Sequence, residues 1–233
     1  MAATIALFPL DYVLLPGVAL PLHIFEPRYR RLVADVGPQG SFGVVLGHPG
    51  PRAVAASSPS SAAGKARAEA PTSSDLADIG TIAEIIERDA YADGRCDLLT
   101  AGTRRFRILR LDTTTAPYLQ ASVEFLDEPA GTDADAALAR VRPLSERYGN
   151  RLDALVDRQA REELADEPVC ASYEVATRLQ LTTTERQGLL AIESAGDRLR
   201  AEAVLLRREL ALLAATRAVP VPSQALHLPV GVN

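Results

Sequence analysis

The stretch from Leu7 to Leu32, LFPLDYVLLPGVALPLHIFEPRYRRL, most constrains what this chain can fold into. Two apolar segments flank Pro16-Gly17, a pair that predicts a turn. The second segment ends at Phe25, and Glu26-Pro27 predicts the start of a short helix, because a proline at the first helical position gives up no hydrogen bond. This order of elements predicts a β-rich domain that is sealed by a small helix.

The rest of the N-terminal half continues the strand pattern. Apolar or alternating runs bounded by turn residues predict strands at residues 4–10, 18–25, 41–46, 79–91, 95–100, 103–111 and 118–126. Pro21 has no N–H to donate, so the strand at 18–25 is expected at an edge or at a bulge. Asp93-Gly94 predicts a hairpin, and Gly102 is expected to separate two strands. About six strands with tight turns predict a closed or nearly closed small barrel.

The barrel region is expected to span residues 1–128 and to contain an insertion. Residues 49–77 are dominated by Pro, Ser, Ala and Gly and show no periodicity, so burial cannot offset the entropy of ordering them. We therefore predict that this segment is a flexible insertion. A helical bundle is expected at 132–217, followed by a tail at 218–233.

Four features define the predicted bundle. Helices are expected at 133–147, with a kink or break at Pro143, and at 151–164 and 171–180. Thr182 and Glu185 have the spacing of a capping box before the next helix. Ser194 and Asp197 are expected to cap a last helix that runs to about residue 217. The apolar stripe of that helix is suited to packing inside the bundle, and it consists of Leu199, Ala203, Leu206, Leu210 and Leu213.

Composition limits the partners and the compartment. A net charge of −5 does not favour nucleic acid or anionic membranes as partners. Cys96 and Cys170 stand alone in separate regions, which argues against a disulfide framework and fits a reducing cytoplasm. The N-terminus has no signal-peptide pattern, and no run of about 18 apolar residues predicts a membrane helix.

A search for chemistry finds no catalytic arrangement. The phosphate-binding pattern GxxxxGK[ST] does not occur, and the single lysine, Lys65, lies in the predicted insertion. The three histidines, His23, His48 and His227, form no metal-binding spacing, and a structural role is expected for His23. We therefore predict no enzyme activity, no cofactor and no metal site.

Several short motifs, in their order along the chain, carry a resemblance to a known family. They are Phe8-Pro9-Leu10, Pro16-Gly17, Pro21-Leu22, Phe25-Glu26, Arg28-Tyr29, the run 79–83, Gly94-Arg95, the run 102–108 and the stretch 179–190. Together they resemble the N-terminal, substrate-binding domain of Lon protease over roughly residues 5–215. The ATPase and protease domains of Lon have no counterpart here, so the resemblance implies a stand-alone form of the domain.

The resemblance implies a PUA-like pseudo-barrel followed by helices, and a role in binding rather than in catalysis. The expected partners are exposed apolar segments of unfolded or extended polypeptides, or another protein. The corner of the barrel between residues 14 and 29 is the candidate binding surface, with Leu14, Pro16, Phe25, Glu26, Arg28 and Tyr29 as its residues. The competing interpretation places Phe25 and Tyr29 in the core.

An alternative function rests on a group of arginines. Arg105 and Arg107 are expected to share one face of a strand, and some PUA-like folds bind RNA. The alternative is therefore an RNA-binding module that uses the Arg105/Arg107 face. A solvated face with local ion pairs explains the same pattern, and fold analogy alone is a weak argument for function.

Overall fold

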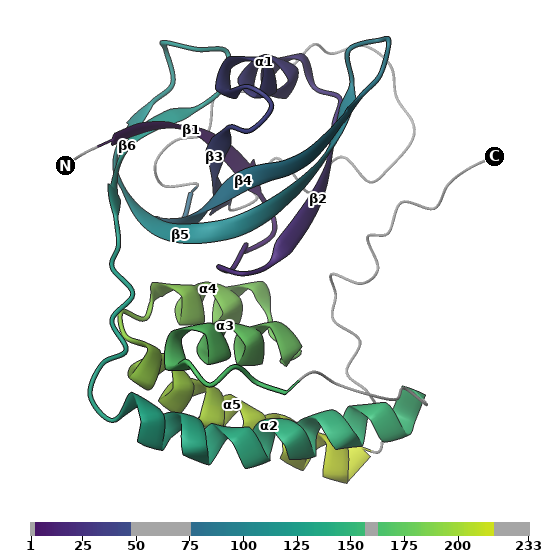
Figure 1. Ribbon diagram of the computed structural model, residues 1–233, viewed down its shortest axis with the longest axis vertical. Coiled ribbons are helices and arrows are strands. Elements are labelled where there is room, and N and C mark those ends of the chain that lie inside the picture. The colour runs from purple at the N-terminus through teal and green to yellow at the C-terminus, as the bar shows by residue number, and fades with distance from the viewer. Residues whose placement is uncertain (1–2, 48–75, 157–162, 217–233) are drawn as a thin grey trace, which may run out of the picture. The chain divides into compact units, whose positions relative to one another are not determined.

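The computed structural model describes residues 3–47, 76–156 and 163–216, and the chain divides into two compact units, Met1–Leu126 and Asp127–Asn233 (Figure 1). Among the described residues, the first unit holds all the strands and one helix, and the second holds the other helices. The predicted α+β class, with about six strands followed by helices, is confirmed.

The first unit is built around one six-stranded mixed sheet. Its strands are β1 (Ala3–Leu10), β2 (Ala19–Ile24), β3 (Ser41–Leu46), β4 (Ile79–Ala90), β5 (Cys96–Asp112) and β6 (Gln120–Phe125). β1 pairs with β3 in parallel, and the other pairings are antiparallel.

The long strand β5 closes this sheet into a pseudo-barrel. β5 is 17 residues long, and its first part pairs with β2 and β4 while its last part pairs with β6. The pairings β5–β4–β3–β1–β6 therefore return to β5, as the curved teal ribbon in Figure 1 shows. β2 lies outside this ring because, among the described strands, it pairs with β5 alone.

The turn at Pro16-Gly17 packs directly against the middle of β5. Gly17 has a φ of +79°, and its N–H donates to the Gly102 carbonyl over 2.8 Å. A Cβ on Gly102 would lie 2.4 Å from the carbonyl oxygen of Leu15, so only glycine fits there. The expectation that Gly102 separates two strands is wrong, because this glycine allows a close backbone approach inside one continuous strand.

A short helix, α1 (Pro27–Val36), covers one end of the sheet and begins at the predicted proline. It buries Tyr29, Leu32 and Val33, and the Tyr29 ring stacks on Phe8 with 4.1 Å between the ring centroids. The helix therefore contributes directly to the core of the first unit. Residues 48–75 of the predicted insertion lie outside the described residues, but Leu76 and Ala77, at its predicted end, are buried and belong to the core.

The second unit contains α2 (Ala134–Val156), α3 (Pro168–Arg178), α4 (Thr183–Ala191) and α5 (Ala195–Thr216). α2 continues through Pro143, so the predicted separate helix from residue 151 is wrong as far as Val156. Proline removes one backbone hydrogen bond, and the packing of α2 along α5 holds the two halves of the helix together. Residues 157–162 and the predicted tail at 218–233 lie outside the described residues.

Both predicted helix caps are present in the second unit. Thr182 and Glu185 form a reciprocal capping box at the start of α4. The Asp197 N–H donates to the Ser194 hydroxyl over 3.2 Å at the start of α5. The predicted stripe of α5 is buried, except that Leu210 is half-buried, and α5 contacts α2, α3 and α4. Within the described ranges, none of the helices has the length and apolar character that crossing a bilayer requires.

Candidate functional site

Three of the six predicted site residues have buried side chains. Leu14 is 1% exposed and Tyr29 is 8% exposed, and both belong to the core of the first unit. Pro16 is buried at the turn that packs on β5. Burial also raises the pKa of the Tyr29 hydroxyl. These three residues shape the corner of the barrel, and their side chains do not lie on its surface.

The other three predicted residues lie at the surface. Phe25 is 60% exposed, so the interpretation that placed it in the core is wrong for this residue. Arg28 is exposed, donates to the Glu26 carboxylate over 2.9 Å, and lies over the Tyr29 ring. Of the predicted set, Phe25 is therefore the apolar side chain that is available to a partner.

Phe25 belongs to a larger group of exposed rings, which we call the aromatic platform: His23, Phe25 and Tyr91. The His23 ring stacks on Phe25 with 6.1 Å between centroids and meets Tyr91 edge-on with 6.3 Å between centroids. Tyr91 is 47% exposed and lies in the turn after β4, whereas His23 and Phe25 lie at the end of β2. The fold thus brings together rings that are far apart in the sequence.

Asp97, on β5, holds two of these rings in place. His23 Nδ1 and the Tyr91 hydroxyl each lie 2.5 Å from a different carboxylate oxygen of Asp97. A carboxylate only accepts hydrogen bonds, so both rings donate to it. The Tyr91 and His23 hydrogen bonds lower the pKa of Asp97, and the Asp97 carboxylate raises the pKa of Tyr91. The Asp97 carboxylate therefore holds the His23 and Tyr91 rings of the platform in place.

The platform continues into a free strand edge. Within the described residues β2 pairs with β5 alone, so its other edge is unpaired. Pro21 pairs with Leu99 and has no N–H, so it fits a position where the backbone nitrogen points away from β5. By alternation, the backbone polar groups of Ala19, Pro21 and His23 face the free edge. The predicted edge position of this strand is confirmed.

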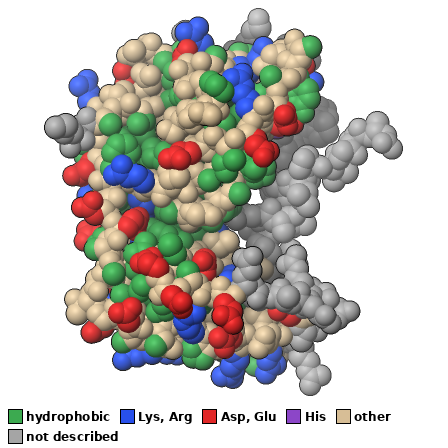
Figure 2. Space-filling view, viewed as in Figure 1, with side chains coloured by type: hydrophobic (Ala, Val, Ile, Leu, Met, Phe, Trp, Pro, Cys, Tyr) green, Lys and Arg blue, Asp and Glu red, His purple; other side chains and the backbone are tan. Residues whose placement is uncertain are grey.

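Apolar side chains line the outward face beside this edge. Ala19 pairs with Ala101 and Pro21 pairs with Leu99, and in each pair the β2 residue is exposed while the β5 residue is half-buried. Ile86 lies at a register shift in β4 and is 56% exposed. Figure 2 shows that apolar side chains also gather in patches on the face of the molecule drawn there.

The structure does not support the RNA-binding alternative. Arg105 is only 1% exposed, so it cannot reach a phosphate backbone. Arg105 pairs with Thr81 and Arg107 pairs with Ile79 in unbroken register with β4. Arg105 and Arg107 therefore share one side of β5, as predicted, but the burial of Arg105 means that they do not form an exposed basic face.

The described residues offer no arrangement suited to metal or thiol chemistry. They contain no group of three or more His, Cys, Asp and Glu side chains that is able to hold a metal ion. Burial raises the pKa of the Cys96 thiol, and burial together with Glu167 raises that of Cys170, so both thiols are held in their less nucleophilic form.

Sequence reasoning missed Tyr91 and Asp97 and assigned His23 a structural role only. The hairpin signal at Asp93-Gly94 places Tyr91 and Asp97 near one another. Nothing in the local sequence shows that β2 pairs with β5, and this pairing brings His23 opposite Asp97.

Comparison with known proteins agrees with this geometry. The family model of the ATP-dependent protease La (LON) substrate-binding domain matches residues 4–208. Lon protease 2 of Syntrophobacter fumaroxidans is 26% identical over 182 residues, which cover 77% of this chain and 21% of that protein. Lon protease of Parabacteroides distasonis is 30% identical over 148 residues, which cover 61% of this chain and 16% of that protein. The chain thus spans about a fifth of the length of these relatives.

Two solved structures share the fold. A Lon N-terminal domain protein from Xanthomonas campestris has a TM-score of 0.56 and 24% identity, covering 85% of this chain and 95% of that one. The N-terminal domain of a Mycobacterium avium complex Lon protease has a TM-score of 0.57 and 17% identity, covering 88% of this chain and 98% of that one. With the family match over most of its length, this chain belongs to the ATP-dependent protease La (LON) substrate-binding domain family.

Proposed function

We infer that this protein is a non-catalytic module that binds extended segments of other polypeptides. The observation that carries this proposal is the aromatic platform, which is exposed, held by Asp97 and continuous with the free edge of β2. The name of the family, a substrate-binding domain of a protease, supports a polypeptide as the partner.

The free edge supplies the backbone part of the interaction. An extended segment adds a strand to β2 and pairs with the outward backbone groups of Ala19, Pro21 and His23. Pro21 offers only a carbonyl, so the incoming segment meets one donor fewer there. Backbone pairing does not depend on the partner's sequence, which suits a module that accepts many different segments.

The aromatic platform supplies the side-chain part. An apolar side chain of the segment covers Phe25, and burial of an exposed aromatic side chain contributes about 1–2 kcal/mol. His23 and Tyr91 are already fixed by Asp97, so binding orders few additional torsions. Such recognition requires no nucleophile, base or metal, and the module acts by holding its partner.

Replacement of Phe25 tests the proposal. The probe is fluorescein-labelled β-casein, a chain without a packed core, and the measurement is fluorescence anisotropy. Phe25→Ser removes the exposed ring, and we expect the Kd for β-casein to rise about tenfold, which corresponds to about 1.4 kcal/mol. Tyr91→Phe keeps the ring but frees Asp97 and is expected to weaken binding about threefold.

Val204→Ser is the matched control, because Val204 is 63% exposed on α5 of the second unit. This variant is expected to bind β-casein as the unchanged protein does. Equal binding by the Phe25→Ser variant, or equal loss in the Val204→Ser variant, contradicts the proposed site. Urea denaturation of each variant separates a loss of binding from a loss of folding.

A further inference from the structure

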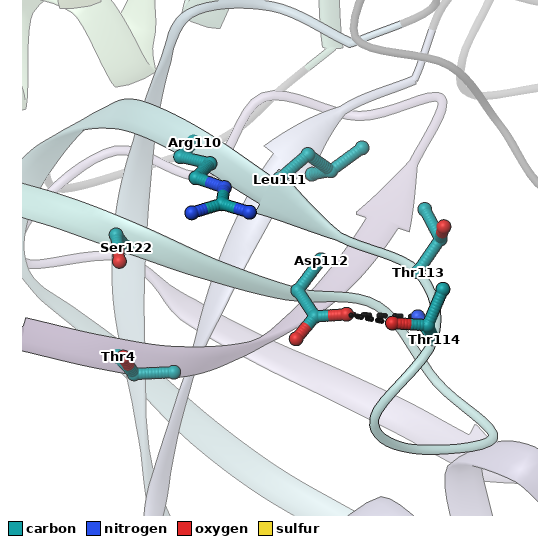
Figure 3. Close-up of a pocket in the computed structure, with 7 residues that line it drawn as sticks. All are labelled: Thr4, Arg110, Leu111, Asp112, Thr113, Thr114 and Ser122. Carbon is teal, nitrogen blue, oxygen red and sulfur yellow. Dashed lines mark hydrogen bonds between the residues drawn. The ribbon is translucent and has the colours of Figure 1, made fainter.

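A hollow lies at the other end of β5, away from the aromatic platform. It encloses about 350 Å³ and is lined by Thr4, Arg110, Leu111, Asp112, Thr113, Thr114 and Ser122 (Figure 3). Ala121 and Val123 are buried, so Ser122 between them lies on the outward face of β6. The hollow, which we call the Arg110 hollow, is therefore on the outside of the barrel.

Three adjacent strands place a row of donors along the Arg110 hollow. Thr4 of β1 pairs with Ser122 of β6, and Ser122 pairs with Arg110 of β5. A register shift between Ile108 and Arg110 inserts Leu109 as an extra residue in β5. Such bulges redirect the side chains next to them, and here Arg110 comes to line the hollow.

The donors of this row are not used within the part of the chain that the structure describes. The Arg110 guanidinium has no ion pair or hydrogen bond there, whereas the guanidinium groups of Arg28, Arg95 and Arg142 all pair with acidic side chains. The hydroxyls of Thr4, Thr113 and Ser122 also have no hydrogen bond among the described side chains and backbone. The Arg110 guanidinium and the hydroxyls of Thr4 and Ser122 are thus available on one side of the hollow, and these are donors that suit a carboxylate.

Asp112 adds a fixed negative charge at one side of the Arg110 hollow. Oδ1 accepts from the Thr114 N–H, the Thr114 hydroxyl and the Thr115 N–H, and Oδ2 accepts from the Thr115 hydroxyl over 2.6 Å. These hydrogen bonds lower the pKa of Asp112 strongly. Oδ2 has only one donor and retains the capacity for another.

Arg110 and Asp112 have opposite charges and lie two residues apart on one strand, yet they form no ion pair in the described structure. The turn at Thr114 and Thr115 holds the Asp112 carboxylate away from the guanidinium. A simple anion satisfies Arg110 but meets repulsion from Asp112. A ligand that carries a carboxylate and, one carbon away, an N–H group offers an anion to Arg110 and a hydrogen-bond donor to Asp112.

We propose that the Arg110 hollow binds the carboxylate of an α-amino-acid unit, with Arg110 on the carboxylate and Asp112 Oδ2 on the neighbouring N–H group. The hydroxyls of Thr4 and Ser122 complete the donors around the carboxylate. Two sources share this chemistry: a free amino acid and the C-terminal residue of a polypeptide. The site is separate from the aromatic platform, and it does not depend on the proposed function.

The test is an NMR titration of the full-length, ¹⁵N-labelled protein, followed through the backbone amides of Thr113, Thr114 and Ser122. The probes are alanine, N-acetylalanine, propionate and N-acetylalanine amide. We expect alanine or N-acetylalanine to change the chemical shifts of these amides. Propionate and N-acetylalanine amide are expected to bind at least tenfold more weakly. Tighter binding of alanine assigns the site to free amino acids, and tighter binding of N-acetylalanine assigns it to chain ends.

Arg110→Gln is expected to raise the Kd of the tighter probe at least tenfold without changing the Tm. Arg207→Gln removes the same charge from an exposed position on α5, and it is expected to bind as the unchanged protein does. Asp112→Asn is expected to reduce the preference for alanine or N-acetylalanine over propionate. Equal binding of propionate, no binding of any probe, or unchanged binding by the Arg110→Gln variant overturns the proposal.

Discussion

Arg198 joins several parts of the helical unit from a fully buried position. Its guanidinium donates to the Ser172 hydroxyl over 2.8 Å and to the carbonyls of Leu189 and Ile192 over 3.2 and 3.1 Å. It also lies 3.4 Å from Glu128 and 4.0 Å from the centroid of the Tyr173 ring. These contacts connect α3, the end of α4 and the start of α5 through one side chain.

Arg198→Ala is expected to lower the free energy of unfolding by about 3 kcal/mol, because it removes a buried guanidinium that donates to the Ser172 hydroxyl and to two carbonyls and that packs on the Tyr173 ring. Urea denaturation measures the change. Arg200→Ala is the control, because Arg200 is exposed and its pair with Asp197 is expected to contribute less than about 1 kcal/mol. Similar losses in the two variants would show that Arg198 has no special role.

Glu202, one turn further along α5, is a buried acid. It has no exposed surface, and neither carboxylate oxygen has a hydrogen-bond partner among the described residues. Burial raises the pKa of Glu202 well above its ordinary 4.5, and the charge of Arg198 only partly opposes this. The folded unit therefore holds this proton more tightly than the unfolded chain does.

The proton on Glu202 links stability to pH. Below about pH 4.5 both states carry the proton, and above it the unfolded chain loses the proton first, so stability falls until the folded pKa is reached. Glu202→Gln is expected to be more stable than the unchanged protein at pH 7 and equal to it below pH 4. Urea denaturation across this range tests the prediction, and a constant difference at every pH would contradict it.

At the scale of elements, the positions of strands and helices followed from the sequence better than their pairing did. Period-two alternation predicted β2 and β6, and the capping box predicted the start of α4, because these signals are local. The burial of Arg105 and the exposure of Phe25 depend on packing between segments that are distant in the sequence, which no local pattern encodes. Sequence reasoning missed the aromatic platform for the same reason.

Gly102 shows how one position determines the geometry of several elements. Gly102→Ala would place a Cβ 2.4 Å from the Leu15 carbonyl oxygen, and we expect a loss of about 1–3 kcal/mol in stability. Hydrogen exchange should speed up in β2, because the turn before it must move. Gly188→Ala is the control, because a Cβ at this position in α4 meets nothing within 4 Å. Alanine favours the helix more than glycine does, so this variant is expected to raise the free energy of unfolding by up to about 1 kcal/mol. A stable Gly102→Ala variant would refute the close-approach argument.

At the scale of the whole molecule, the features that we propose for binding belong to one unit. β2, the aromatic platform and the Arg110 hollow all lie between Met1 and Leu126, which form one compact unit with its own core. The second unit has its own internal connections through Arg198 and the capping box of α4. The family match covers parts of both units, so the recognition of the family does not by itself say which unit binds.

A fragment of residues 1–126 is therefore expected to fold and to bind β-casein with a Kd within about threefold of that of the full chain. Circular dichroism and anisotropy measure the two properties. The fragment 127–233 is the control, and it should be helical but show no binding. A folded 1–126 fragment that fails to bind would show that the second unit takes part in recognition.

The closed pairing of β5 has a mechanical consequence for any chain captured at β2. β2 is joined to β5 by six residue pairs, and β5 is tied on to β4 and β6. If a segment captured at β2 is pulled along its own axis, the force acts across all of its backbone hydrogen bonds to β2 at once, and these bonds must break together. If the segment is instead pulled away from β2 at one end, its hydrogen bonds break one after another. The direction of the force therefore determines how readily the segment dissociates.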